Sequence, residues 1–456
     1  QKGDCGGVLS LEGHAEKQSR RVIGIHVAGE PTLGVGLSTV LTQEILLKMT
    51  EGLNLISEAP YVGQMALKPI SAPIEGSFIG YTETERKHHT NPTSCLERTP
   101  LHNAWGECVK IPAKLKPFFR DGELIKPMEK ALKPYATPIM SYDPIDVRRA
   151  VKHAFTKLRA ATVDSERRLF DIREASAGLP GTTINAVPRN TSPGYPWILD
   201  RITNKKVFYG NEGEYQFTSK HFLLHQDEVN TIIERAKKGI RSDHYFTDFL
   251  KDELRKPEKV LAGETRLISS CPLDYTVCWR EYFMAFTDAV QSTRIRNGIA
   301  IGINPYVEWD FLAKHLTIKG PHCVAGDFKA FDSSLQPDIL WAILDEINEW
   351  YDDGPENALV RRVLWMEVVH SRHFGGLSGT ADSFYQWNKS LPSGHPATSV
   401  INSLYNLTIF NMVWTDIMGV AMASRFWEFV SICVYGDDNI LNIDPRVIDR
   451  FNQSTI

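Results

Sequence analysis

The sequence lacks the marks of a secreted, disulfide-rich or membrane-spanning protein. Its 456 residues include only seven cysteines, an odd number without any CxxC pair, which argues against a disulfide framework and for a reducing compartment. The most apolar stretch, residues 407–434, is interrupted by Asp416, Arg425 and Glu428, so it predicts a core helix followed by a strand. Neither a signal peptide nor a membrane span is predicted.

A strong excess of either charge is also lacking, with 51 basic and 55 acidic residues and a formal net charge of −4. This balance excludes a protein that coats polyanions over its whole surface, so any path for nucleic acid must be a local basic channel. The sequence has no internal repeats or low-complexity tracts. Its composition, 42% hydrophobic and 23% charged, is that of a globular chain long enough for two or three domains.

Near the start of the chain, the pentapeptide Gly3–Gly7 surrounds Cys5 with glycines. Glycines beside a nucleophile let the backbone approach a substrate carbonyl and let N–H groups point at a developing oxyanion. A buried, inert cysteine in a glycine-rich turn is the alternative interpretation. Residues 21–29 predict a strand that carries His26 beside small residues, whereas His14 is better explained as an exposed loop histidine.

Residues 53–87 are rich in proline, glycine and small polar residues, which predicts a junction between domains. Within it, Glu75-Gly76 and Gln64-Met65 are candidate points of proteolytic cleavage. A group of histidines and cysteines follows, but its spacings fit no standard zinc-ligand pattern, so zinc is not expected there. This group consists of His88, His89, Cys95, His102 and Cys108.

Further along the chain, two runs of strand-forming residues flank the tetrapeptide Tyr435–Asp438. The runs, residues 429–434 and 439–443, predict a β-hairpin whose turn carries the carboxylates of Asp437 and Asp438. Gly-Asp is also good turn chemistry in its own right, so this pattern alone leaves a purely structural turn open.

A second pair of carboxylates lies upstream of the hairpin. Residues 323–328 predict a buried strand that ends at Asp327, and residues 331–335, which include Asp332, then open a helix predicted to run through Leu344. Asp332 could also serve only as a helix N-cap. If the strand lies beside the hairpin, Asp327 faces Asp437, and their repulsion requires cations between them. Two Mg²⁺ ions about 4 Å apart would fit there and act on both oxygens of an in-line phosphoryl displacement.

Between these carboxylates, residues 391–404 predict a Gly/Pro loop that feeds a helix. Ser393, Thr398 and Asn402 are small hydrogen-bonding residues, and the last two are four positions apart on one helix face. Together with Asp332 they could recognise a ribose 2′-hydroxyl, which separates RNA from DNA building blocks. Taken singly, each could equally be a cap or a helix-surface residue.

Two upstream segments could bind other parts of a nucleic acid or nucleotide. The rigid turn 191–197 carries two aromatics and could guide a template strand. Residues 251–259 and Arg266 alternate basic side chains through a predicted extended segment, which would suit a triphosphate. The alternative is a solvated charge run that is paired internally, because acidic residues are interspersed. These are Asp252, Glu253, Glu258 and Glu264.

In order along the chain, these motifs resemble the RNA-dependent RNA polymerases of picorna-like positive-strand RNA viruses. The series runs from Thr-Ser-Pro-Gly-Tyr-Pro through Lys-Asp-Glu-Leu-Arg, Asp-x4-Asp and Pro-Ser-Gly-x3-Thr-x3-Asn to Tyr-Gly-Asp-Asp, and it covers roughly Thr90 to the end. About the first fifty residues are similar to the C-terminal barrel of the chymotrypsin-like cysteine proteases of picornavirus-like viruses. His395 and Pro396 within the loop point to a dicistrovirus-like lineage.

This resemblance implies an α+β fold, the fingers and palm of a right-hand polymerase with an antiparallel palm sheet and helices, preceded by part of a chymotrypsin-like β-barrel. The implied domains are residues 1–52 for the protease part, 53–87 for the junction and 88–456 for fingers and palm. The chain begins with Gln and ends soon after the hairpin, so we expect it to be a piece of a polyprotein. The family's thumb would follow the last residue.

The resemblance also implies roles for individual residues. Asp327 and Asp437 would bind two Mg²⁺ ions, for which Mn²⁺ could substitute, and Asp438 would be an auxiliary metal ligand. The cations of the triphosphate channel would be Lys251, Arg255, Lys259 and Arg266. The ribose-sensing residues would be Asp332, Ser393, Thr398 and Asn402. In the protease part, Cys5 would be the nucleophile and His26 would line the substrate pocket, but the family's general base lies earlier in chain order.

The implied partners are an RNA template, a primer or product strand, ribonucleoside triphosphates, the viral polyprotein as protease substrate, and other replication proteins. The implied location is the host cytoplasm, at membrane-associated replication complexes. A reverse transcriptase and a non-catalytic RNA-binding precursor are the alternatives. The pair Asp332 and Asn402 argues against the first, because it favours ribonucleotides. Without a thumb, this piece alone is expected to extend primers poorly.

Overall fold

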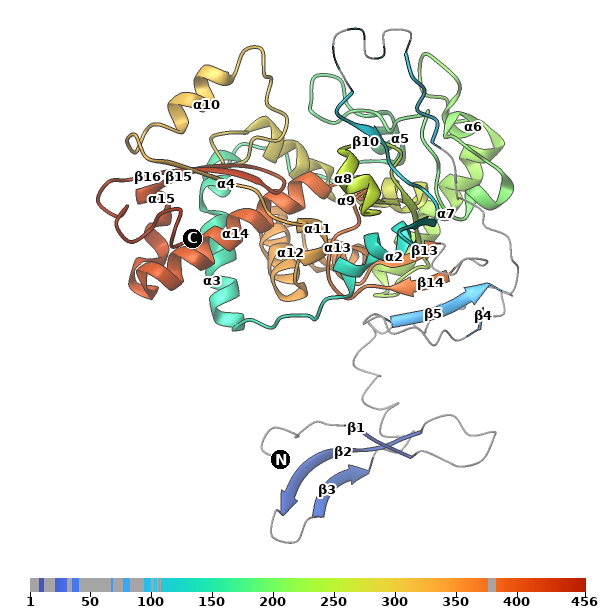
Figure 1. Cartoon of the computed structure of the whole chain (residues 1–456), viewed down its shortest axis with the longest axis horizontal. Coiled ribbons are helices and arrows are strands. Elements are labelled where there is room, and N and C mark those ends of the chain that lie inside the picture. The colour runs from blue at the N-terminus through green and yellow to red at the C-terminus, as the bar shows by residue number, and fades with distance from the viewer. Residues whose placement is uncertain are drawn as a thin grey trace. The chain divides into compact units, whose positions relative to one another are not determined.

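The computed structural model describes residues 108–375 and 383–456, residues 94–99, 102, 104 and 106, and the backbone of strands β1 to β5. The chain divides into two units. One comprises Gln1–Ala59 with Lys238–Ile240, and the other comprises Pro60–Lys237 with Arg241–Ile456. Figure 1 shows their elements along the chain.

The described part of the first unit is a three-stranded antiparallel sheet. Its strands are β1 (Val8–Leu11), β2 (Arg21–Glu30) and β3 (Val35–Val40), in the order β1-β2-β3. The strand predicted for residues 21–29 is therefore confirmed as β2, and the backbone of His26 pairs with Ser38. Cys5 and His14 lie outside the described residues. The protease barrel stays a prediction.

The larger unit contains a six-stranded sheet with the order β11-β9-β13-β14-β5-β4. Strands β13 and β9 are parallel, and the other neighbours are antiparallel. The strands of the predicted junction, β4 and β5, complete one edge of this sheet. The bounds are Leu67–Lys68 for β4, Ser77–Thr82 for β5, Phe246–Leu250 for β9, Leu267–Ser270 for β11, Arg372–Gly375 for β13 and Ser383–Gln386 for β14.

A second sheet, which we call the carboxylate sheet, has the order β12-β16-β15. Its strands are β12 (Cys323–Gly326), β15 (Val430–Tyr435) and β16 (Asp438–Ile443), which confirms the predicted hairpin. The prediction that β12 is buried is wrong, because three of its four residues are exposed. As an edge strand it pairs on one side only, and its small residues leave the backbone accessible.

Helices make up much of the rest of the described chain. Those that position the two sheets are α3 (Pro144–Ala154), α7 (Lys220–Lys237), α9 (Leu273–Ser292), α12 (Pro337–Tyr351), α13 (Pro355–Val369) and α14 (Thr398–Met418). The short ones are α2 (Pro127–Leu132), η1 (Lys133–Ala136), α4 (Thr156–Ala161), α5 (Ile172–Ala177), η2 (Trp197–Asp200), α6 (Lys206–Tyr209), α8 (Pro257–Leu261), α10 (Trp309–His315), α11 (Phe331–Ser334), η3 (Val420–Arg425) and α15 (Phe426–Phe429). Four minor strands pair as β6 (Ile111–Pro112) with β10 (Leu254–Arg255) and β7 (Phe118–Arg120) with β8 (Glu123–Ile125).

One predicted helix is divided in two. The helix expected from Phe331 to Leu344 ends at Ser334, and α12 begins at Pro337. Proline has no backbone N–H and restricts the residue before it to extended conformations, so it starts a helix more readily than it continues one.

The core of the larger unit is built from aromatic side chains on α9, α12, α13 and α14. Trp279 stacks on Phe283 with ring centroids 3.7 Å apart, and Trp365 packs against both rings. Figure 1 shows α14 alongside the β15–β16 hairpin, with α3 and α12 packed against the same helix. The buried apolar surface thus fixes α14 against the carboxylate sheet.

Candidate active site

The turn of the β15–β16 hairpin carries the carboxylate of Asp437, and Asp438 follows it directly. Tyr435 pairs with Asp438, so Gly436 and Asp437 form a two-residue turn. Gly436 has a φ of 64°, a conformation that glycine adopts without the steric cost of a Cβ atom. The turn leaves Asp437 half-buried and Asp438 exposed at the tip.

Asp327 lies at the same end of the carboxylate sheet as this turn. The last pair between β12 and β16 joins Gly326 to Asn439, so Asp327 is the next residue, beside the turn. Burial, and then the negative charges of Asp437 and Asp327, raise the pKa of Asp438 above its usual value. The sheet therefore brings three carboxylates together. None of the causes of the Asp438 shift is a cationic side chain that would offset their repulsion.

Oxygen ligands of this kind fit a hard divalent cation such as Mg²⁺. Within the described ranges, no three His, Cys, Asp or Glu side chains are gathered so that they alone could hold a metal ion. Mg²⁺ usually keeps several waters and takes its other ligands from substrate phosphates, so a pair of carboxylates is a sufficient protein contribution. For zinc, the described candidates Cys95, His102 and Cys108 are exposed, and His88 and His89 lie outside the described residues.

Asp332 and Asn402 contact each other as the sequence predicts. Asn402 Nδ2 donates to Asp332 Oδ1 at 2.6 Å, while Asn402 Oδ1 is buried without a hydrogen-bond partner among the described residues. Burial raises the pKa of Asp332, the bond from Asn402 lowers it, and the charge of Asp437 raises it. The N-cap interpretation of Asp332 is wrong, because Ala330 occupies that position of α11.

Ser393 and Thr398 do not join that contact. Ser393 Oγ accepts a hydrogen bond from the Ser269 N–H at 3.1 Å. Thr398 Oγ1 lies 2.8 Å from the His395 carbonyl and 3.1 Å from the Pro392 carbonyl. The Thr398 hydroxyl therefore shapes the loop that precedes α14, and the Ser393 hydroxyl docks this loop on β11.

The basic residues predicted to bind triphosphate lie along residues 251–266, which we call the cation wall. The segment is not extended throughout, because α8 interrupts it and carries the exposed Lys259. Glu253 pairs with Arg266 and lies 3.7 Å from Lys251 Nζ and 3.9 Å from Arg255 Nε. The hydrogen bond from Arg266 lowers the pKa of Glu253, against burial. Internal pairing is thus present, as the alternative interpretation expected.

Comparison with known proteins identifies the family. Residues 107–455 match the family described as viral RNA-dependent RNA polymerase. The chain belongs to this family. It is 32% identical to the replicase polyprotein of Drosophila C virus and 31% identical to that of Cricket paralysis virus, in each case over 100% of this chain and 27% of the relative. The chain thus spans about a quarter of the length of these relatives, which come from dicistroviruses and picornavirus-like viruses.

The fold is also that of a solved viral polymerase. The structure of the Sicinivirus 3Dpol RNA-dependent RNA polymerase matches with a TM-score of 0.64 at 22% identity, covering 86% of this chain and 73% of the other. The α+β polymerase architecture is thereby confirmed. Within the described part of the chain, none of the helices combines the length and the apolar character needed to cross a bilayer.

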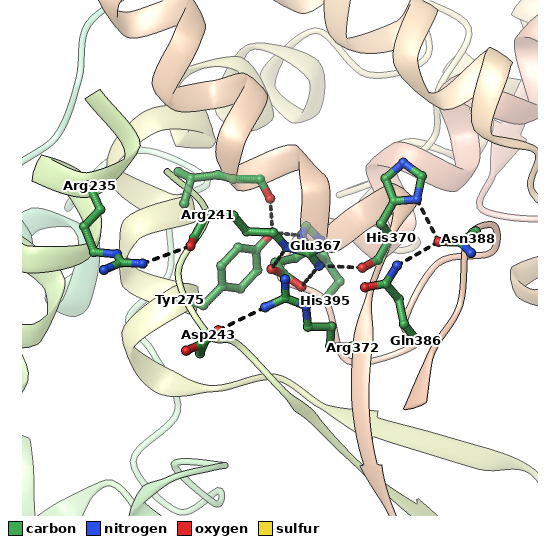
Figure 2. Close-up of polar contacts among 11 residues, drawn as sticks. Arg235, Arg241, Asp243, Tyr275, Glu367, His370, Arg372, Gln386, Asn388 and His395 are labelled. Atoms are coloured by element: carbon green, nitrogen blue, oxygen red, sulfur yellow. Dashed lines mark hydrogen bonds and ion pairs between the residues drawn. The ribbon is translucent and has the colours of Figure 1, made fainter. Parts of the chain in front are cut away.

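In this viral polymerase chain, the buried side chain of His395 holds the loop that precedes α14 against α9. Figure 2 shows His395 pointing at Tyr275 of α9. The Ala397 N–H donates to His395 Nδ1 at 3.2 Å, so Nε2 carries the proton and donates to the Tyr275 hydroxyl at 3.0 Å. That hydroxyl donates to the Leu364 carbonyl at 2.9 Å, and burial lowers the pKa of His395 to about 3. From the sequence, His395 is interpreted only as an indication of lineage.

A buried ion pair supports the same region of the polymerase chain, as Figure 2 also shows. Arg241 donates to Glu367 at 2.6 and 2.8 Å, and the side chains are 5% and 1% exposed. Burial alone would raise the pKa of Glu367, but the charge and the hydrogen bonds of Arg241, together with smaller contributions from His244 and Arg372, hold that pKa below its usual value. Arg372 extends the network to Asp243 at 3.1 Å. No local motif signals this pair, because 126 positions separate the partners.

The loop predicted to guide template, residues 191–197, is held by side chains behind it. Lys205 Nζ donates to the Thr191 hydroxyl and the Ser192 carbonyl, both at 2.6 Å, and Trp197 Nε1 donates to Asp274 at 2.8 Å. Burial lowers the pKa of Lys205 to about 8. The loop is therefore fixed at both ends.

Proposed function

We propose that this chain carries the fingers and palm of an RNA-templated RNA polymerase of a positive-strand RNA virus. The observation that carries the proposal is the position of Asp327 and Asp437 at one end of the carboxylate sheet, in a chain of this family. Their repulsion and their oxygen ligands suit Mg²⁺.

In the proposed reaction, the 3′-hydroxyl oxygen of a primer attacks the α-phosphorus of a ribonucleoside triphosphate, a phosphodiester bond forms and pyrophosphate leaves. Asp327 and Asp437 would hold two Mg²⁺ ions, with Asp438 as an auxiliary ligand. When bound, these ions activate the attacking oxygen and neutralise the leaving group. The cation wall would receive the triphosphate, which must displace Glu253 from Arg266 and its neighbours.

Selection for ribose follows from the contact between Asp332 and Asn402. Asn402 Oδ1 is a buried acceptor without a partner among the described residues. A buried acceptor left unpaired is costly, and a ribose 2′-hydroxyl could donate to it. A deoxyribose would leave it unpaired. This difference supports a ribonucleotide substrate over the deoxynucleotide that a reverse transcriptase uses.

The test is template-directed extension of an RNA primer by the viral polymerase that carries this segment with its flanking sequences. We expect incorporation of ribonucleotides in preference to deoxynucleotides, loss of synthesis in Asp437→Asn, and a reduced preference in Asn402→Ala. Preferential use of deoxynucleotides would contradict the proposal, as would full activity of Asp437→Asn.

We further propose that residues 1–52 are the C-terminal part of a cysteine protease, with Cys5 as nucleophile and His26 in the substrate pocket. The motifs around both residues and the polyprotein relatives support this assignment. RNA synthesis and polyprotein cleavage would take place in the host cytoplasm, at membrane-associated complexes that contain other replication proteins. Expression of the viral polyprotein with Cys5→Ala tests the assignment: we expect its processing to stop, and normal processing would contradict it.

A further inference from the structure

Two buried side chains of α14 contact the backbone of the turn that carries the carboxylates. Ser403 Oγ accepts a hydrogen bond from the Gly436 N–H at 2.8 Å. Asn406 Nδ2 lies 3.0 Å from the carbonyl oxygens of both Gly436 and Asp437, and 3.4 Å from that of Asp438. Ser403 and Asn406 are each 0% exposed. The tip of the hairpin is thus bonded to a helix that is not its neighbour in sequence.

The direction of the Asn406 amide follows from these contacts. If the amide were reversed, its oxygen would face three carbonyl oxygens and repel them, so the NH₂ group must point at the turn. As a result, Asn406 Oδ1 is buried without a hydrogen-bond partner among the described residues. A polar atom left in this state is costly and uncommon in native proteins. Asn406 therefore bonds the turn through its NH₂ group while its amide oxygen is left unpaired among the described residues.

The same helix also contacts the ribose-sensing carboxylate. Asn402 lies one helical turn before Asn406 and donates to Asp332 Oδ1 at 2.6 Å. Aromatic and aliphatic packing fixes α14 against α3, α12 and β15. One rigid helix therefore sets the position of Asp332 and of the turn that bears Asp437.

We infer that Ser403 and Asn406 are positioning residues that fix the direction of the Asp437 carboxylate toward a divalent cation. This inference rests on the proposed function. Metal ligands act only when they are held within about 0.5 Å of the productive geometry, and the two turn residues, Gly436 and Asp437, form no ladder pair beyond the closing pair Tyr435–Asp438. Ser403 and Asn406 supply those bonds from outside the hairpin.

The experiment measures the binding of Mn²⁺ alone to the 456-residue chain by electron paramagnetic resonance, alongside thermal unfolding. We expect Asn406→Ala to weaken Mn²⁺ binding roughly tenfold, the size of effect expected from losing a buried hydrogen bond. Ser403→Ala should weaken it by less, and Ser403→Thr, which keeps the hydroxyl, should restore it. In the complete polymerase, Asn406→Ala should lower kcat and leave the KM for nucleotide nearly unchanged.

Asn411→Ala is the matched control. Asn411 is a buried asparagine of the same helix whose NH₂ group donates to the Leu407 carbonyl at 2.9 Å, within α14 itself. We expect this variant to lose a similar amount of thermal stability and to bind Mn²⁺ as the parent does. Equal loss of Mn²⁺ affinity in Asn406→Ala and Asn411→Ala would overturn the inference, because both would then act through stability alone.

A comparison of Asp437→Asn with Asn406→Ala separates this inference from the proposed function. If Asp437→Asn leaves Mn²⁺ binding unchanged, the proposed metal site is wrong. If Asp437→Asn weakens binding but Asn406→Ala does not, the metal site stands and the positioning role is wrong. If Asn406→Ala fails to fold, Ser403→Ala, which removes a single hydroxyl, decides in its place: unchanged Mn²⁺ affinity in that variant overturns the inference.

Discussion

The carboxylate sheet and the cation wall differ in whether their charged side chains have internal partners of opposite charge. At the sheet, burial and then the negative charges of Asp437 and Asp327 raise the pKa of Asp438, so like charges lie close together. At the wall, Glu253 pairs with Arg266 and faces Lys251 and Arg255, so part of the positive charge is already paired internally. We therefore expect the sheet to bind cations, whereas a ligand of the wall would have to replace the internal partner Glu253.

The largest effect is expected at the carboxylate sheet. Asp327→Asn keeps the size of the side chain and removes its charge, so it should lower kcat on the order of a thousandfold, about 4 kcal/mol of transition-state stabilisation. Single-turnover primer extension by the complete polymerase checks this. Asp449→Asn, at an exposed aspartate beyond β16, is the control and should leave kcat unchanged.

A smaller effect is expected at the cation wall. Arg266→Ala removes a bidentate donor and should raise the KM for nucleotide roughly tenfold, or about 1.4 kcal/mol, with kcat less affected. Steady-state kinetics with varied nucleotide concentration measures it. Arg425→Ala breaks a similar exposed pair, with Glu428 at 2.7 and 2.8 Å, and should not change KM. An equal rise in both variants would mean that Arg266 has no special role.

The internal partner of the wall should act in the opposite direction. Glu253→Gln removes the charge that competes with triphosphate, so it should lower the Kd for inorganic tripolyphosphate. The expected change is about two- to fivefold, which corresponds to the small free energy of a partly exposed ion pair. Isothermal titration calorimetry checks this. A weaker affinity in this variant would show that Glu253 orders the wall and does not compete with the ligand. The contrast drawn between sheet and wall would then fail.

The smallest effect on synthesis is expected at His395, which lies in the loop that precedes α14 and belongs to neither charged region. Burial lowers its pKa from 6.5 to about 3, so between these values the unfolded chain binds a proton that the folded chain does not. The free energy of unfolding should therefore fall as pH drops below 6.5. His395→Gln should reduce that slope by about 1.4 kcal/mol per pH unit. Urea unfolding between pH 4.5 and pH 6.5 measures it, and an unchanged slope would contradict the buried neutral histidine.

Features encoded by short local patterns could be predicted from the sequence. The hairpin around Tyr435–Asp438 follows from strand-forming residues on either side of a Gly-Asp turn, and β12 follows from the run that ends at Asp327. The accessibility of β12 could not be predicted, because it depends on the strand being at the edge of its sheet. The break before Pro337 shows that one proline can outweigh an amphipathic pattern.

Contacts between distant residues could not be predicted in the same way. Arg241 and Glu367 are 126 positions apart, and Tyr275 and His395 are 120 apart, so no local pattern pairs them. Asn406 lies in a helix that is apolar on nearly all sides, where a single asparagine carries no sequence signal. Asn402 and Asp332, which do contact each other, are grouped from the sequence as hydrogen-bonding residues for one ribose, and the family resemblance joins their motifs.

The central claim is that Asp327 and Asp437 share divalent cations at the end of the carboxylate sheet. A crystal of the polymerase grown with Mn²⁺ and a non-hydrolysable ribonucleoside triphosphate tests this most directly, through anomalous scattering. We predict two Mn²⁺ peaks about 4 Å apart, each within bonding distance of a carboxylate of this pair. Peaks elsewhere with neither aspartate as a ligand would contradict the account.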